Sequence, residues 1–139
     1  MSLELHLKIV GVSLIALGLA HFLFPKRFHW KEELERLSLL NRQIFWVHDW
    51  FVVLTIIMFG IVSLVYTDSL LAYSKLAEVV LAGFFTFWLC RLYVQFFVYD
   101  SSLWKGDRFN TRVHIAFSLT WLYYVMVYGC ALLYQLGWV

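Results

Sequence analysis

Three histidines and two aspartates occur within or at the ends of strongly apolar segments, where ionisable side chains are rare and usually functional. They are His21, His48, Asp49, Asp100 and His114. Neutral imidazole is a common ligand of zinc, iron and copper, and a carboxylate can complete the coordination sphere. This set therefore predicts a divalent metal site with three or four protein ligands, although it includes no local ligand motif such as HExxH or paired CxxC.

A second polar group follows the spacing of one helix face. Arg91, Gln95 and Tyr99 stand at positions i, i+4 and i+8 of an otherwise apolar segment. A guanidinium group binds phosphate or carboxylate oxygens in a bidentate manner. The three residues therefore predict a substrate-binding face for the polar head of an amphipathic, lipid-soluble molecule, beside which His48 or His114 would act as a general base.

Other interpretations of the same residues stay open. Two of the histidines would also serve as axial ligands of a b-type haem, with Arg91, Arg42 or Lys26 near its propionates; a c-type haem is excluded because CxxCH is absent. Arg91 could instead pair with Asp49 or Asp100, and each histidine with a backbone carbonyl. The chain could also be a non-catalytic accessory subunit of a larger membrane complex, so whether it is an enzyme stays undecided.

The composition indicates which elements must position these side chains. Of the 139 residues, 63% are hydrophobic and 14% are charged, and the mean hydropathy is +0.76. A soluble domain carries about 25% charged residues, so this chain is suited to lipid and not to water. The net charge of +2, without a basic run, excludes nucleic acid as a partner and leaves membrane lipid and a lipid-soluble small molecule.

Four apolar stretches have the length of a membrane-spanning helix, which is about 20 residues. They cover approximately residues 7–24, 44–66, 76–99 and 113–136, and the first is expected to stop at Pro25. Residues 30–39 have the pattern of a short amphipathic helix at the membrane surface. The sequence thus predicts an all-α, integral membrane four-helix bundle with one domain over residues 1–139. Close helix approach is expected at Gly11, Gly18, Gly60 and Gly83.

Charge in the connecting segments predicts an orientation. Lysines and arginines gather in the two longer connections, around residues 26–43 and 100–112, whereas only Lys8 and Lys75 flank the opposite side. The positive-inside rule places the longer connections in the cytoplasm, together with the ends of the helices that carry the polar residues. We therefore expect a bacterial inner membrane protein with both termini in the periplasm, alone, as a homo-oligomer or within a larger membrane complex.

Overall fold

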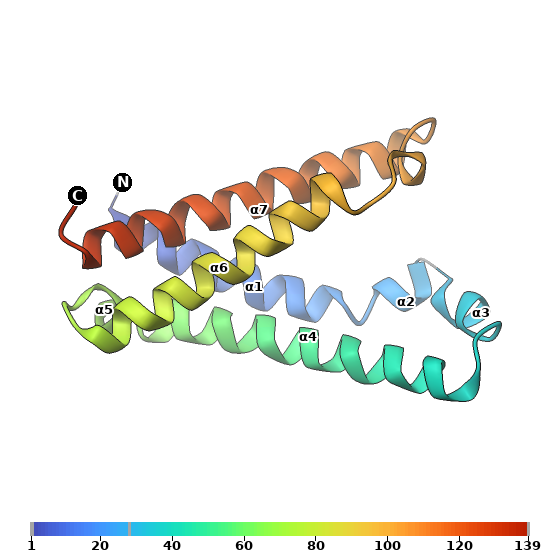
Figure 1. The fold of residues 1–139 in the computed structure, drawn as a ribbon, viewed down its shortest axis with the longest axis horizontal. Coiled ribbons are helices and arrows are strands. Elements are labelled where there is room, and N and C mark those ends of the chain that lie inside the picture. The colour runs from blue at the N-terminus through green and yellow to red at the C-terminus, as the bar shows by residue number, and fades with distance from the viewer. Residues whose placement is uncertain (1, 28, 139) are drawn as a thin grey trace. The chain divides into compact units, whose positions relative to one another are not determined.

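The computed structural model describes residues 2–27 and 29–138. Met1, Phe28 and Val139 lie outside the described residues, and with them the two ends of the predicted single domain. The described residues form helices and no strands (Figure 1). Within this described part, four helices are long and apolar enough to cross a membrane: α1 (Leu3–Ala20), α4 (Leu39–Val65), α6 (Lys75–Phe97) and α7 (Arg108–Gln135). The predicted all-α class is confirmed, a four-helix bundle fits it, and the chain is a membrane protein.

The chain divides into two compact units, and each is described by itself. The first unit is Lys8–Tyr66, and the second is Met1–Leu7 together with Thr67–Val139. The first contains most of α1, the short helices α2 (Phe24–Arg27) and α3 (Trp30–Leu34), and α4. The second contains α5 (Thr67–Leu71), α6, the 3-10 turn η1 (Ser101–Leu103) and α7. The prediction of one domain over residues 1–139 stays a prediction.

In the first unit, glycines bring the backbones of α1 and α4 together. A Cβ atom added at Gly60 would lie 2.9 Å from the carbonyl oxygen of Gly11 and 3.1 Å from the backbone nitrogen of Ile15. One added at Gly18 would lie 2.5 Å from Cγ1 of Ile57. The expected close approach is therefore present at these three glycines. Gly83, in the second unit, differs, because nothing lies within 4 Å of the site of its missing Cβ.

Three predicted boundaries in the first unit are wrong, and one of them is the start of α4, at Leu39 and not at residue 44. Helix α1 ends at Ala20 and not at residue 24, and the chain then makes successive turns in which the amides of residues 22–24 bond carbonyls three residues earlier. Pro25 does not stop α1; it lies in the first turn of α2, where its missing N–H is not needed. The predicted amphipathic helix over residues 30–39 is shorter, because α3 ends at Leu34 and Ser38 already caps the N-terminus of α4.

The second unit is built on the hairpin of α6 and α7, which lie side by side. Its interior is aromatic: the buried ring of Trp88 stacks on Trp121 with centroids 5.0 Å apart, and Tyr124 meets Trp88 edge-on at 4.8 Å. Helix α7 begins at Arg108 and not at residue 113. The reason is that the Asp107 carboxylate accepts hydrogen bonds from the backbone amides of Phe109 and Asn110.

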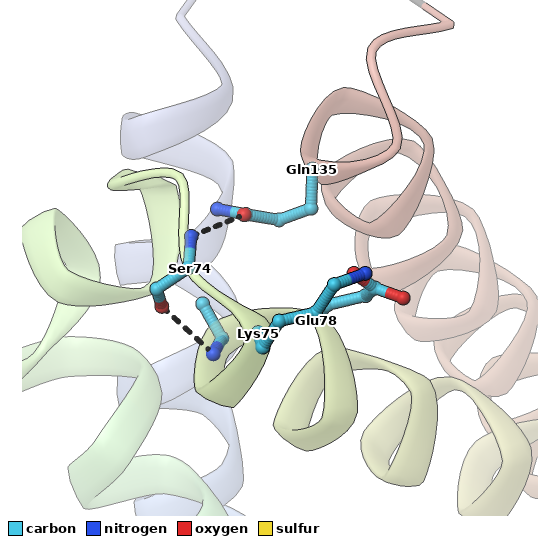
Figure 2. A network of polar contacts seen from close by, with 5 residues as sticks. Ser74, Lys75, Glu78 and Gln135 are labelled. Atoms are coloured by element: carbon cyan, nitrogen blue, oxygen red, sulfur yellow. Dashed lines mark hydrogen bonds and ion pairs between the residues drawn. The ribbon is translucent and has the colours of Figure 1, made fainter.

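Gln135 fastens the end of α7 to the connection between α5 and α6. Its Oε1 accepts a hydrogen bond from the amide of Ser74 at 3.2 Å (Figure 2), and its Nε2 donates to the carbonyl oxygens of Leu70 and Ala72 at 2.7 and 3.0 Å. The Ser74 hydroxyl accepts in turn from the amide of Ala77 and caps α6. One buried amide thus satisfies three backbone groups that helix ends leave unpaired.

We expect Gln135→Leu to lower the free energy of unfolding by about 1–2 kcal/mol, because it leaves these three backbone groups without a partner. The matched control is Glu78→Gln, which removes the nearby ion pair between Lys75 and Glu78 (2.6 Å; Figure 2). The Lys75 side chain is 90% exposed, so that pair adds at most about 1 kcal/mol. Thermal unfolding in detergent compares the two, and a smaller loss in Gln135→Leu than in the control would contradict this role.

Candidate functional site

A chain of hydrogen bonds links the polar residues of α6 and α7 in the second unit. Nη1 of Arg91 donates to Oε1 of Gln95 at 3.2 Å, and Nε1 of Trp121 donates to the same oxygen at 3.3 Å. On its other side, Gln95 Nε2 lies 2.8 Å from Nδ1 of His114. Gln95 is only 4% exposed. A buried amide therefore connects a guanidinium, an indole and an imidazole from two helices.

Arg91 is held by aromatic rings and an amide, not by a carboxylate. Its guanidinium carbon lies 5.0 Å from the centroid of Trp121 and 5.5 Å from that of Tyr99. Within the described part of the second unit, Arg91 forms no ion pair. Ring faces attract a cation but do not neutralise it. A positive charge on a membrane-length helix is thus left without a counter-charge from its own unit.

The hydrogen bonds assign the proton of His114. Gln95 Oε1 faces two donors, so its Nε2 is the atom that faces His114. An amide N–H only donates, so Nδ1 of His114 accepts, and the neutral ring carries its proton on Nε2. Trp104 stacks on the imidazole with centroids 3.8 Å apart and an interplanar angle of 8°, which fixes the plane of the ring. His114 therefore presents an N–H donor, not a free basic nitrogen.

Asp100 follows α6 but has a different environment. Its carboxylate accepts a hydrogen bond from the amide of Ser102 at 2.7 Å and caps the turn η1. The hydrogen bonds from the side chain and backbone of Ser102 lower the pKa of Asp100. It does not pair with Arg91. Asp100 thus has a local structural role in this connection, and the sequence interpretation of an Arg91–Asp100 pair is not seen.

The first unit holds the other predicted ligands. His21 and Asp49 line one cavity, whereas His48 is exposed and does not line it. Nδ1 of His21 lies 2.9 Å from the carbonyl oxygen of Leu17, and Nδ1 of His48 lies 2.8 Å from that of Ile44. A carbonyl only accepts, so both rings carry a proton on Nδ1, and Nε2 of the neutral ring is an acceptor. Their tautomer is the opposite of that of His114.

Among the residues that the structure describes, no group of three or more His, Cys, Asp or Glu side chains is placed to hold a metal ion. Of the predicted ligands, His21 and Asp49 share a cavity, and Nδ1 of His114 is occupied by Gln95. The metal site and the haem alternative stay predictions, and the geometry of each unit gives them no further support.

Sequence reasoning missed two features of the second unit. Nδ1 of His6 lies 2.8 Å from the hydroxyl of Tyr123, across 117 residues of sequence. The indole N–H of buried Trp88 has no hydrogen-bond partner among the described residues. His6 stands close to the N-terminus between Glu4 and Lys8, where a polar residue carries no distinct signal, so only its contact with α7 reveals its partner. For Trp88, burial was foreseeable from hydropathy, but the unpaired donor was not.

Comparison of the chain with protein-family models, with curated proteins and with solved structures finds no match. The class that fold and sequence define is a membrane protein of four apolar helices, and its function must be inferred from its own residues.

Proposed function

We propose that the protein binds, within the membrane, an amphipathic molecule by its anionic head group, and that Arg91 provides the main contact. The observation that carries the proposal is the guanidinium of Arg91, which has no carboxylate partner in its unit. An uncompensated cation in a membrane segment is costly and favours an anionic partner. A phosphate or carboxylate head satisfies this charge, and its apolar tail remains in lipid.

Further donors belong to the same hydrogen-bonded and stacked group of residues as Arg91 and support an anion as the ligand. The guanidinium has five N–H groups, of which the Gln95 amide accepts one bond. The Nε2–H of His114 and the indole N–H of Trp88 have no hydrogen-bond partner among the described residues. Gln95 lies one helical turn after Arg91 and orients its guanidinium through this hydrogen bond, since residues at i and i+4 are neighbours on a helix. The cluster therefore offers donors and positive charge, which are the groups that recognise phosphate and carboxylate.

Binding, and not a chemical step, is the function that this arrangement favours. A general base needs an unprotonated nitrogen, and His114 carries its proton on the nitrogen that Gln95 does not occupy. The basic connections at residues 26–43 and 100–112 suit a cytoplasmic position for this end of α6, which makes the cytoplasmic leaflet the expected source of the ligand.

Octyl phosphate is a suitable probe, because it combines a phosphate head with a short apolar chain. We expect it to bind the detergent-purified protein, and we expect Arg91→Leu to weaken its affinity about tenfold or more, since a charge-assisted bidentate contact is lost. Arg91→Lys should weaken binding less, because lysine keeps the positive charge but lacks the paired N–H donors of a guanidinium. Titration calorimetry in a non-ionic detergent measures each affinity.

The matched control is Arg42→Leu, which removes a guanidinium from the first unit, where Arg42 lines a cavity with Lys31 and Glu35. We expect the affinity for octyl phosphate to remain within about twofold of the wild type in this variant. Equal affinities in Arg91→Leu and the wild type would overturn the proposal. Failure of the wild type to bind octyl phosphate would also overturn it, and would favour an accessory subunit in which Arg91 has only a structural role.

A further inference from the structure

A second candidate ligand site lies in the first unit and shares no residue with the proposed anion site. A cavity of about 190 Å³ lies between the turn that ends α1 and the N-terminal half of α4. It is lined by His21, Phe22, Pro25, Trp46, Asp49, Trp50 and Val53. Sites that enclose a whole drug-sized ligand measure roughly 300–1,000 Å³. This cavity therefore has the size for a head group and not for an entire lipid.

The cavity combines one negative charge with aromatic rings. Asp49 is half-buried and, among the described residues, forms neither an ion pair nor a hydrogen bond. Trp46 and Trp50 flank it on the same face of α4, and Phe22 faces them from the turn after α1. Aromatic faces beside a carboxylate form the environment that recognises alkylated ammonium groups. The remaining polar group, His21, presents an unprotonated Nε2 in its neutral form, which adds no positive charge.

A separate apolar groove lies beside this cavity on α4. It has a volume of about 230 Å³ and is lined by Val47, Trp50, Phe51 and Leu54, the spacing of one helix face. Trp50 lines both the cavity and the groove. From Trp50 the lining residues of the groove follow α4 toward its middle, a stretch of the helix without charged residues. A ligand with its head at Asp49 would thus find room for an alkyl chain that points into the membrane.

We propose that this cavity binds the ammonium head of a single-chain cationic amphipath, with Asp49 as the counter-charge and the chain along the groove from Val47 to Leu54. The site needs no residue of the second unit and no metal ion. It explains the carboxylate of Asp49 better than the predicted metal site does. A metal ion needs at least three protein ligands, and the cavity supplies only His21 besides Asp49.

Hexyltrimethylammonium and tetramethylammonium test the head and the chain separately. We expect both to bind the detergent-purified protein, and hexyltrimethylammonium to bind about tenfold more tightly, because its chain buries several methylene groups. Asp49→Asn should weaken the binding of both about tenfold or more, since the ammonium loses its counter-charge. The matched control is Asp100→Asn, which removes an exposed carboxylate in the second unit and should leave both affinities unchanged.

Three results would overturn the proposal. One is that 3,3-dimethylbutanol, the neutral isostere of choline, binds as tightly as choline itself, because recognition would then not depend on charge. Another is that stoichiometric Zn²⁺ displaces hexyltrimethylammonium and binds more tightly to the wild type than to Asp49→Asn, which would make the cavity a metal site. Retention of full affinity by a folded Asp49→Asn protein would exclude the carboxylate as the counter-charge, whatever the ligand.

Discussion

Gln95→Glu is expected to abolish the binding of octyl phosphate while the protein remains folded and at least as stable as the wild type. Oε1 of Gln95 already lies 3.2 Å from Nη1 of Arg91, so a glutamate in the same rotamer places a carboxylate against the guanidinium. The internal ion pair would satisfy the charge that we assign to an external anion. Trp121 would keep its acceptor, because its indole N–H can donate to the carboxylate.

This substitution also predicts a spectroscopic change at His114. The glutamate replaces the N–H donor that faces Nδ1 with an oxygen that only accepts. The neutral imidazole must then carry its proton on Nδ1, the opposite tautomer from that of the wild type. Nitrogen chemical shifts of labelled histidine distinguish the two forms. An unchanged tautomer together with undiminished octyl phosphate binding would show that the Arg91–Gln95–His114 chain is not the binding site.

Gln95→Leu provides the contrast, because it removes the amide without supplying a charge. The indole N–H of Trp121 and Nδ1 of His114 lose their partners inside the α6–α7 hairpin, and Arg91 loses its acceptor. We expect the free energy of unfolding to fall by about 2–4 kcal/mol, as unpaired buried polar groups each cost about 1–3 kcal/mol. Equal stability of Gln95→Leu and Gln95→Glu would mean that the hydrogen bonds of Gln95 contribute nothing measurable.

The long helices could be predicted from the sequence because length and hydropathy are properties of a segment as a whole. Their ends could not, because ends depend on single hydrogen bonds. Ser38 and Asp107 cap α4 and α7, and each moves the start of its helix several residues ahead of the apolar stretch. Pro25 misled the prediction at α1, since a proline stops a helix from its interior but fits the first turn of the next one.

In the candidate site, too, some features could be predicted from the sequence and others could not. Arg91 and Gln95 could be placed on one face by spacing alone, because residues four apart are neighbours on a helix. Tyr99 lies beyond the end of α6 at Phe97, although its ring still lies 5.5 Å from the Arg91 guanidinium carbon. The partners from α7 could not be assigned, because they depend on how the two helices are aligned in the hairpin. Trp104 comes from the connection between them, and no periodicity places it on His114. The tautomers of the histidines, which decide what each ring can bind, follow only from their hydrogen-bond partners.

Alanine substitution at Gly18, Gly60 and Gly83 is expected to change the free energy of unfolding by different amounts. The difference depends on which atoms the added Cβ would contact. At Gly60 a Cβ meets backbone atoms of α1, at 2.9 Å from the Gly11 oxygen and 3.1 Å from the Ile15 nitrogen, and a backbone yields only if the whole helix shifts. We expect Gly60→Ala to lower the free energy of unfolding by about 1–3 kcal/mol, the range for overpacking. At Gly18 the obstacle is Cγ1 of Ile57, a side-chain atom that can move, so the loss should be smaller.

Gly83 is the matched control, at which alanine is expected to raise and not to lower the free energy of unfolding. Its Cβ position is open to 4 Å, so Gly83→Ala meets no clash and gains helix propensity, which raises the free energy of unfolding by up to about 1 kcal/mol. Thermal unfolding of the three variants in one detergent measures the order. If Gly60→Ala were as stable as Gly83→Ala, the contact of α1 with α4 would be looser than 2.9 Å implies. If Gly83→Ala were the least stable, the position of its Cβ would be filled and not open to 4 Å.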